Sequence, residues 1–300
     1  MIKRTLYFGN PARLSRKDAQ LVVSFPSETG RPDASVPIED IGIVILDDPQ
    51  ISIGQALLGS LLENNVAVLC TDERHMPAGL FLNMQGHSEM AERFSWQIEA
   101  SIPLKKNLWQ QTVEQKITNQ AALLKRLGQP WEDIDLMSHQ VKSGDIENKE
   151  GHAAALYWRR LFDPELGFKR GRYEGGPNAL LNYGYAVLRA VVARSLVGSG
   201  LLLALGIHHR NKYNAFCLAD DIMEPYRPFV DALVCNIVDG DLDYTELTPA
   251  LKRELLQIPV LDVEMDGERS PLMIATQRTS AGLARCFEGK TRKIVYPQLE

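Results

Sequence analysis

The sequence predicts an α+β protein: a small N-terminal β-rich domain, residues 1–90, followed by a larger all-helical C-terminal domain, residues 91–300. Two patterns support this. Up to about residue 85, short β-prone runs alternate with polar turns, and from Ser88 onward apolar residues recur at helical spacing. A length of 300 residues also suits about two domains.

The first domain is expected to hold several short strands and one helix. A hairpin with a polar tip is predicted over 12–25, and Ser52 is a helix cap before the apolar spacing of 52–64. The other strands are expected at 5–8, 36–38, 41–46, 66–70 and 79–82.

The second domain is expected to consist of helices joined by polar loops. In 104–127 the apolar residues recur every three to five positions, and the helix over 146–162 ends at Asp163-Pro164 because a residue before proline disfavours helical backbone. The stretch 168–177, rich in Gly, Lys and Arg, is a predicted loop. The other helices are expected from 88 and over 131–141, 178–197, 220–238, 248–256 and 271–286.

Composition excludes several classes of protein. The 45% hydrophobic content and net charge of −5 exclude disorder as the main state. The sequence lacks a run of about 18 apolar residues, the length that a membrane span requires. The residues before Tyr7 do not have the pattern of a secretory signal, so a cytoplasmic location is expected. The four cysteines, none in a C-x-x-C pair, are expected to be reduced core residues. The mild acidity argues only weakly against nucleic acid, since local patches decide binding.

The common catalytic motifs are absent. The sequence has no G-x-S-x-G, no P-loop, no G-x-G-x-x-G after a strand, no H-E-x-x-H and no calcium loop. Their absence excludes the commonest hydrolase, nucleotidase, dinucleotide-binding and zinc-protease interpretations.

Three polar features interrupt apolar helical patterns instead. Glu150 begins a small-residue face, although a carboxylate in a first helical turn also suits the helix dipole. His208 and His209 follow an apolar stretch, where a structural histidine is the commoner finding. Asp221 and Glu224 share a helix face and could equally form a surface charge ladder.

Together these residues form a mixed nitrogen and oxygen ligand set. One glutamate, one histidine and one or two acidic residues suit Mg²⁺ or Mn²⁺, and the set lacks the thiolates of a structural zinc site. Glu150 lies far from the other two segments in sequence, so only folding could assemble the set.

The same segments resemble the Cas1 family of CRISPR-associated integrases, which insert new spacers into CRISPR arrays. The matches are N-x-E-G-x-A-A-x-x-Y-W from Asn148, the G-I-H-H-R-N segment, and A-x-D-I-M-E-P-Y-R-P from Ala219, in that order. The stretch 176–185 also looks like the family, and the H-H-R-N form is most similar to the type II branch.

The resemblance implies metal ligands at Glu150, His209 and Glu224. His209 is preferred to His208 because its spacing to Glu224 resembles the type II pattern, and Asp221 is a fourth acidic position, either a ligand or an orienting residue. The implied reaction is attack of a DNA 3′-hydroxyl on a phosphodiester, assisted by Mg²⁺ or Mn²⁺; with water as the nucleophile, the same site would act as an endonuclease.

The resemblance also implies partners. These are double-stranded DNA (prespacer and CRISPR repeat), a second copy bound through the β-rich domain as a homodimer, and a Cas2 dimer, with no membrane role. Tyr173 and Tyr213 could stack on a frayed base. The predicted phosphate contacts are Arg159, Arg160, Lys169, Arg170, Arg172, Arg210 and Lys212, which could otherwise be solvated surface residues.

Two alternatives remain open from the sequence. One is a non-catalytic DNA-binding scaffold with the same fold, and the other is a plain metal phosphodiesterase with no role in integration.

Overall fold

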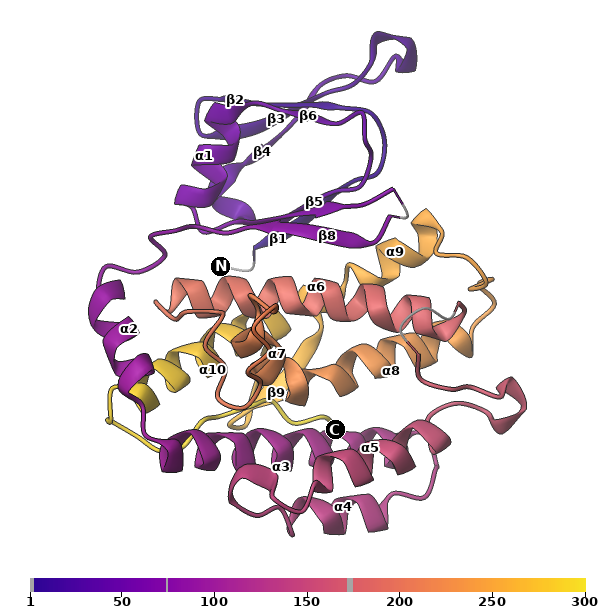
Figure 1. The fold of residues 1–300 in the computed structure, drawn as a ribbon. Helices are drawn as coiled ribbons and strands as arrows, with labels where there is room; N and C mark the ends of the chain where they lie inside the picture. The colour runs from indigo at the N-terminus through magenta and orange to yellow at the C-terminus, as the bar shows by residue number, and fades with distance from the viewer. Residues whose placement is uncertain (1–2, 74, 172–174) are drawn as a thin grey trace. The chain divides into compact units, whose positions relative to one another are not determined.

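The structure is a computed structural model that describes residues 3–73, 75–171 and 175–300. The chain divides into two compact units, residues 1–88 and 89–300. Among the described residues, the first unit holds two β-sheets and one α-helix, and the second is mostly helical (Figure 1). The α+β class predicted from the sequence is therefore confirmed.

The first unit contains two four-stranded sheets. One has the order β1-β5-β7-β8, in which β1, β5 and β7 are parallel and β8 is antiparallel. The other has the order β4-β3-β2-β6. The elements are β1 (Arg4–Phe8), β2 (Arg13–Lys17), β3 (Gln20–Ser24), η1 (Ser27–Thr29), β4 (Ala34–Pro37), η2 (Ile38–Asp40), β5 (Ile41–Leu46), β6 (Ser52–Ile53), α1 (Gln55–Glu63), β7 (Ala67–Thr71) and β8 (Pro77–Phe81).

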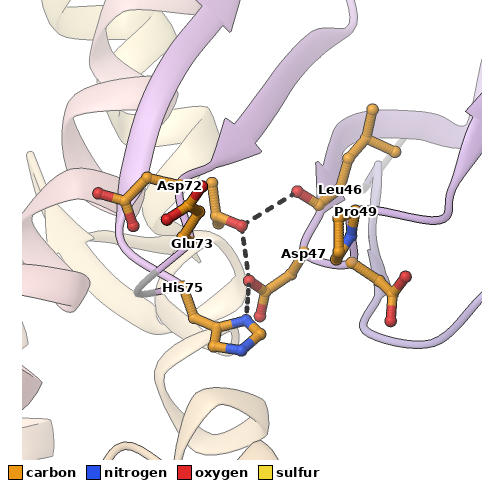
Figure 2. A pocket seen from close by; sticks show the side chains of 8 residues that line it. Leu46, Asp47, Pro49, Asp72, Glu73 and His75 are labelled. Atoms are coloured by element: carbon orange, nitrogen blue, oxygen red, sulfur yellow. Dashed lines mark hydrogen bonds and ion pairs between the residues drawn. The ribbon is translucent and has the colours of Figure 1, made fainter.

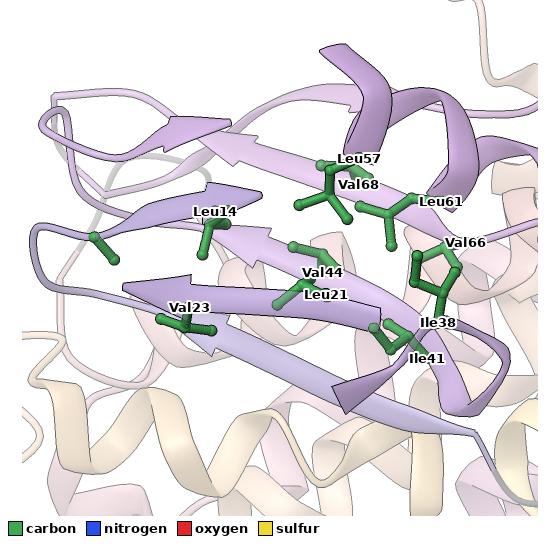
Figure 3. Packing of buried hydrophobic residues seen from close by; sticks show 11 residues of the cluster. Leu14, Leu21, Val23, Ile38, Ile41, Val44, Leu57, Leu61, Val66 and Val68 are labelled. Carbon is green, nitrogen blue, oxygen red and sulfur yellow. The ribbon is translucent and has the colours of Figure 1, made fainter. Parts of the chain in front are cut away.

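The core of the first unit joins both sheets to α1. Leu14 and Leu21 from one sheet, Val44 and Val68 from the other, and Leu57 from the helix belong to one buried cluster (Figure 3). Strand β5 is buried at five of its six residues, in agreement with its continuous apolar sequence.

The second unit is built around two long helices, α3 and α6. Helix α6 is buried at 16 positions around its circumference, and α7 and α8 contact both long helices. The helices are α2 (Met90–Glu99), α3 (Ile102–Arg126), α4 (Glu132–Ser138), η3 (Ser143–Asp145), α5 (Lys149–Arg160), η4 (Pro164–Leu166), α6 (Pro177–Gly198), α7 (Cys217–Met223), η5 (Glu224–Tyr226), α8 (Arg227–Val238), α9 (Pro249–Leu255), η6 (Ile258–Val260) and α10 (Leu272–Phe287).

The prediction that this unit is all-helical is wrong in one place. Strands β9 (Asp262–Met265) and β10 (Glu268–Pro271) form an antiparallel hairpin. Its two-residue turn is Asp266-Gly267, with φ angles of 54° and 75°, a pairing typical of tight hairpins. The Asp-Gly pair between two short runs is the local sequence signal for this hairpin.

The helix expected over 220–238 is broken into three pieces. Helix formation begins earlier, at Cys217, so Pro225 falls beyond the first turn and removes a backbone donor there. The chain therefore tightens into the short turn η5 before α8 begins at Arg227. Because of this break, Glu224 lies at the junction between α7 and η5 rather than within one continuous α-helix.

All four cysteines are free thiols, and three of them are buried. Burial raises the pKa of the Cys286 thiol to about 11, which keeps it protonated near neutral pH. Among the described residues, no helix has the length and apolar character needed to cross a membrane.

Candidate metal centre

Glu150 stands in the first turn of α5, and its position is set by Asp145. The Asp145 carboxylate accepts hydrogen bonds from the backbone N–H groups of Lys149 (2.8 Å) and Glu150 (3.1 Å), which satisfies two donors at the helix start. The expected helix over 146–162 begins later, at Lys149, because Asp145 and Asn148 adopt left-handed backbone with φ of 49° and 52°. The cap directs this turn toward α3.

The histidine pair lies in the loop after α6 and is held by Asp221 of α7. The fully buried Asp221 carboxylate accepts from the backbone N–H groups of His208 (2.9 Å) and His209 (3.2 Å) and lies 2.5 Å from His209 Nδ1. Because Asp221 occupies Nδ1, the other ring nitrogen of His209, Nε2, remains for a ligand. Asp221 therefore holds the backbone and the ring of His209 in this structure.

Gly206 allows this loop to pass close to Asp221. A Cβ atom at this position would lie 2.5 Å from the His209 carbonyl oxygen, 2.6 Å from Asp221 Oδ2 and 3.2 Å from Cys217 Cβ. Any larger residue would have to displace the histidine turn or its carboxylate partner.

Trp109 of α3 supports both histidines. Its ring stacks on His208 at 4.2 Å between centroids, and it meets His209 edge-on at 5.8 Å. Burial lowers the pKa of His208, whereas the hydrogen bond that His209 makes to the Asp221 carboxylate outweighs burial and raises the pKa of His209. The two adjacent histidines therefore sit in different environments, and His209 is the one directed by a carboxylate.

Lys116 of α3 brings the two glutamates together. Its ammonium nitrogen lies 2.6 Å from Glu150 Oε1 and 2.6 Å from Glu224 Oε2. The contact with Glu150 is a hydrogen bond. The contact with Glu224 is close enough for an ion pair, but the buried Glu224 Oε2 has no hydrogen bond that meets the angular criteria. Burial alone would lower the pKa of Lys116, but the charges of Glu224 and Glu150 outweigh it and raise that pKa.

Glu224 is a buried carboxylate that remains ionised. Burial alone would raise its pKa, but the charges of Arg227 and Lys116 outweigh that effect and lower it. Arg227 Nε lies 2.9 Å from Glu224 Oε1, and its guanidinium lies 4.6 Å from the centre of the Tyr185 ring. Glu224 therefore carries a negative charge held in place from two sides.

The donor set fits a divalent cation. Glu150 and Glu224 direct one oxygen each to a common cationic partner, and His209 keeps one ring nitrogen open. Mg²⁺ and Mn²⁺ favour such oxygen ligands with an added imidazole. Within 3–73, 75–171 and 175–300, no three His, Cys, Asp or Glu side chains already lie in a metal-binding arrangement; the Lys116 ammonium stands between the carboxylates.

The predicted basic residues divide into two groups. Arg160 donates to both carboxylate oxygens of Asp133, at 2.6 and 2.8 Å, and Arg170 donates to Asn178 and Asn182. These two guanidinium groups are engaged within the protein, where they fasten α5 to α4 and the 168–171 segment to α6. Arg172 and Tyr173 lie outside the described residues.

The remaining predicted contacts are exposed. Tyr213 is 85% exposed and lies beside Lys212, whose ammonium nitrogen is 4.8 Å from its ring centre. Arg210 precedes them in the same loop, directly after the histidines. The other exposed members of the set are Arg159 and Lys169.

Sequence reasoning missed the contribution of α3. Thr112, Lys116 and Asn119 are buried polar residues on one face of a helix whose other buried positions are mainly apolar. Their spacing of three or four residues is the one available signal, because polar residues that interrupt a buried helical stripe need partners. The identity of those partners, which come from distant segments, could not be read from the spacing.

A separate hollow of about 720 Å³ lies in the first unit, at the carboxyl ends of β5 and β7 (Figure 2). Its buried Asp47 accepts hydrogen bonds from Tyr7 (2.6 Å) and Thr71 (2.7 Å) and lies 2.9 Å from His75 Nδ1. None of the residues predicted to bind metal or DNA lines this hollow.

Known structures place the fold in a defined class. A casposase bound to its integration product superposes with a TM-score of 0.80 at 21% identity, covering 98% of this chain and 92% of that one. A Cas6-RT-Cas1–Cas2 complex contains a chain that matches with a TM-score of 0.76 at 18% identity, covering 99% of this chain and 36% of that one. The fold is that of Cas1 and casposase proteins.

Sequence comparison narrows the class to a family. The family model described as CRISPR associated protein Cas1 matches residues 6–246. A CRISPR-associated endonuclease Cas1 from Neisseria meningitidis serogroup C (strain 8013) is 34% identical over 302 aligned residues, which cover 100% of this chain and 97% of the relative. This chain belongs to the Cas1 family.

Proposed function

We propose that this protein is a divalent-metal-dependent DNA strand transferase and endonuclease that inserts short foreign DNA fragments into a CRISPR array in antiviral defence. The observation that carries the proposal is the pair of carboxylates, Glu150 and Glu224, which share one cation position near a histidine oriented by Asp221. Family membership and the casposase fold support it.

The proposed ligands are Glu150, Glu224 and Nε2 of His209. A Mg²⁺ or Mn²⁺ ion bound there would activate the attacking 3′-hydroxyl and neutralise charge that develops on the phosphate. Asp221 holds the His209 ring through Nδ1 and leaves Nε2 for the proposed ligand role, while Trp109 makes an edge-type contact with the same ring. Arg227 holds Glu224 in its ionised form.

DNA binding is assigned to the exposed members of the predicted basic set. Arg210 and Lys212 follow the histidine turn directly, so phosphates bound to them would lie near the proposed metal. Arg159 lies in the last turn of α5, whose first turn carries Glu150, and Tyr213 offers an exposed ring for stacking. Lys169 completes this set, whereas Arg160 and Arg170 are assigned structural roles.

We further propose a homodimer formed through residues 1–90 and an integration complex with a Cas2 dimer. The Cas6-RT-Cas1–Cas2 complex contains a chain of the same fold, which supports the Cas2 partner. A location in the cytoplasm, where CRISPR arrays and invading DNA meet, follows from this role.

The test is a strand-transfer assay with purified protein, Cas2, a short duplex prespacer and a supercoiled plasmid that carries the array. Joined product should require Mn²⁺ or Mg²⁺, disappear with EDTA, and disappear in Glu150→Gln while DNA binding persists. Glu254→Gln removes an exposed carboxylate elsewhere in the same unit and should leave joining unchanged.

The prespacer ends distinguish the alternatives. A prespacer with 3′-hydroxyl ends should be joined, and one with 3′-phosphate ends should not, because only the hydroxyl can attack. Equal cleavage products from both would indicate a plain phosphodiesterase. DNA binding without joining in every metal would indicate a non-catalytic scaffold.

A further inference from the structure

The ammonium group of Lys116 occupies the place between the two proposed carboxylate ligands. Its side chain is only 11% exposed, and its two charged partners, Glu150 and Glu224, come from α5 and η5. A lysine buried to this degree normally needs paired negative charge, and here both charges belong to the proposed metal centre.

The position of Lys116 is built into α3 rather than adopted by a loose side chain. One turn earlier, Thr112 donates to the Leu108 carbonyl and contacts the Tyr296 hydroxyl at 2.8 Å. One turn later, Asn119 donates to the carbonyl of Pro225, the residue after Glu224, at 2.7 Å. The helix is thus fixed on both sides of Lys116 against the segments that surround the centre.

We propose that Lys116 is a built-in counter-cation that holds Glu150 and Glu224 together without metal and must leave them when a divalent metal binds. This inference rests on the proposed metal site. The ammonium nitrogen is 2.6 Å from an oxygen of each carboxylate, and Mg²⁺ requires oxygens at about 2.0–2.1 Å in the same space. Like charges also repel, so the two cations exclude each other.

The consequence is that metal binding competes with an internal ligand. If Lys116 occupies the centre more than about nine-tenths of the time, removing it should tighten metal binding by about tenfold or more, because the binding-competent fraction of the protein rises. The same change should destabilise the metal-free protein, since two neighbouring carboxylates would then lack their shared partner.

Mn²⁺ binding provides the test. Free Mn²⁺ is measured by electron paramagnetic resonance during titration of EDTA-treated, full-length protein, for the wild type, Lys116→Met, Lys125→Met and Glu150→Gln. Lys125 is an exposed lysine of the same helix, so its substitution is the matched control. We expect tighter binding in Lys116→Met, unchanged binding in Lys125→Met and strongly weakened binding in Glu150→Gln.

The outcomes separate the two proposals. If Lys116→Met binds Mn²⁺ as the wild type does, or more weakly, while Glu150→Gln loses binding, the counter-cation is refuted and the metal site stands. If Glu150→Gln and the wild type do not differ, the metal site itself fails, and the counter-cation fails with it.

A second measurement needs no variant at this position and covers the case in which Lys116→Met does not fold. Amine labelling of the wild type, read by mass spectrometry, should modify Lys116 slowly without metal and at least several-fold faster in saturating Mn²⁺, with Lys125 as the internal reference. Equal labelling of Lys116 with and without bound Mn²⁺ would overturn the proposal.

Discussion

Substitution of Gly206 by alanine should damage the centre although it replaces none of the proposed ligand residues. The added Cβ would lie 2.5 Å from the His209 carbonyl oxygen and 2.6 Å from Asp221 Oδ2, both well inside van der Waals contact. Neither atom can yield easily. The Asp221 carboxylate is fully buried and engaged with both histidine backbone N–H groups, and the carbonyl belongs to the histidine turn itself.

The expected cost follows from these contacts. Overpacking typically costs about 1–3 kcal/mol, and loss of one hydrogen bond to a charged group costs about 1.5–3 kcal/mol. We therefore expect Gly206→Ala to lower the free energy of unfolding by about 3 kcal/mol, which in a unit of this size lowers Tm by about 6–12 °C. Displacement of Asp221 should also weaken Mn²⁺ binding about 10- to 100-fold, as for other residues that orient a ligand.

Gly282→Ala is the matched control. Gly282 lies within α10, and a Cβ there would meet no atom within 4 Å, so alanine should raise stability by about 0.5–1 kcal/mol through its better helix propensity. Urea unfolding followed by tryptophan fluorescence suits both variants, since all four tryptophans lie in residues 89–300. Equal stability and equal Mn²⁺ affinity in Gly206→Ala and the wild type would show that the loop adapts, and would refute the reasoning.

Three further predictions concern other residues. Arg210→Ala should weaken DNA binding and reduce the salt slope of log K by about 0.9, whereas Arg160→Ala should leave that slope unchanged; a salt titration of DNA affinity decides. Asn119→Ala should cost about 2–4 kcal/mol and speed hydrogen exchange in residues 294–299, because Asn119 donates to Pro225 and Pro297 and accepts from Leu299; unchanged exchange would contradict it. Burial raises the pKa of Asp231 to about 6 despite hydrogen bonds from Tyr185 and Tyr157. Between about pH 4 and 6 the folded state therefore keeps a proton that the unfolded chain releases, so stability falls as pH rises. Asp231 should make the protein about 2 kcal/mol less stable at pH 7 than at pH 4.5, and Asp231→Asn should remove this term from urea-measured stabilities at the two pH values.

The order and class of the elements could be predicted from the sequence because periodicity carries that information. The apolar spacing after Leu108 predicts α3, and the continuous apolar run of Ile41–Leu46 predicts a strand. The ends of the helices are harder to predict. The left-handed backbone at Asp145 and Asn148 shortens α5, and Pro225 divides a helix that looked continuous, because both effects depend on where each helix begins.

The candidate centre could be predicted only in part. Glu150, His209 and Glu224 stand in motifs that can be recognised locally, but the part played by Lys116 depends on residues 34 positions away and further along the chain. A single lysine in a helix has the same local pattern whether it faces solvent or two buried carboxylates. Arg160 and Arg170 illustrate the converse, since a basic sequence cannot show which guanidinium groups are already engaged within the fold.

The buried polar residues on one face of α3, Thr112, Lys116 and Asn119, have a consequence for synthesis on the ribosome. Asn119 binds the carbonyl of Pro297 and the N–H of Leu299, and Thr112 meets Tyr296, so α3 completes its contacts only with segments made much later. At about 5–20 residues per second, α3 emerges roughly 10–30 s before those partners. During this interval the nascent helix exposes the amide, hydroxyl and ammonium groups of these three residues, and water solvates such groups well. The centre around Glu224 therefore matures last, and a partly translated chain is expected to lack a working nuclease.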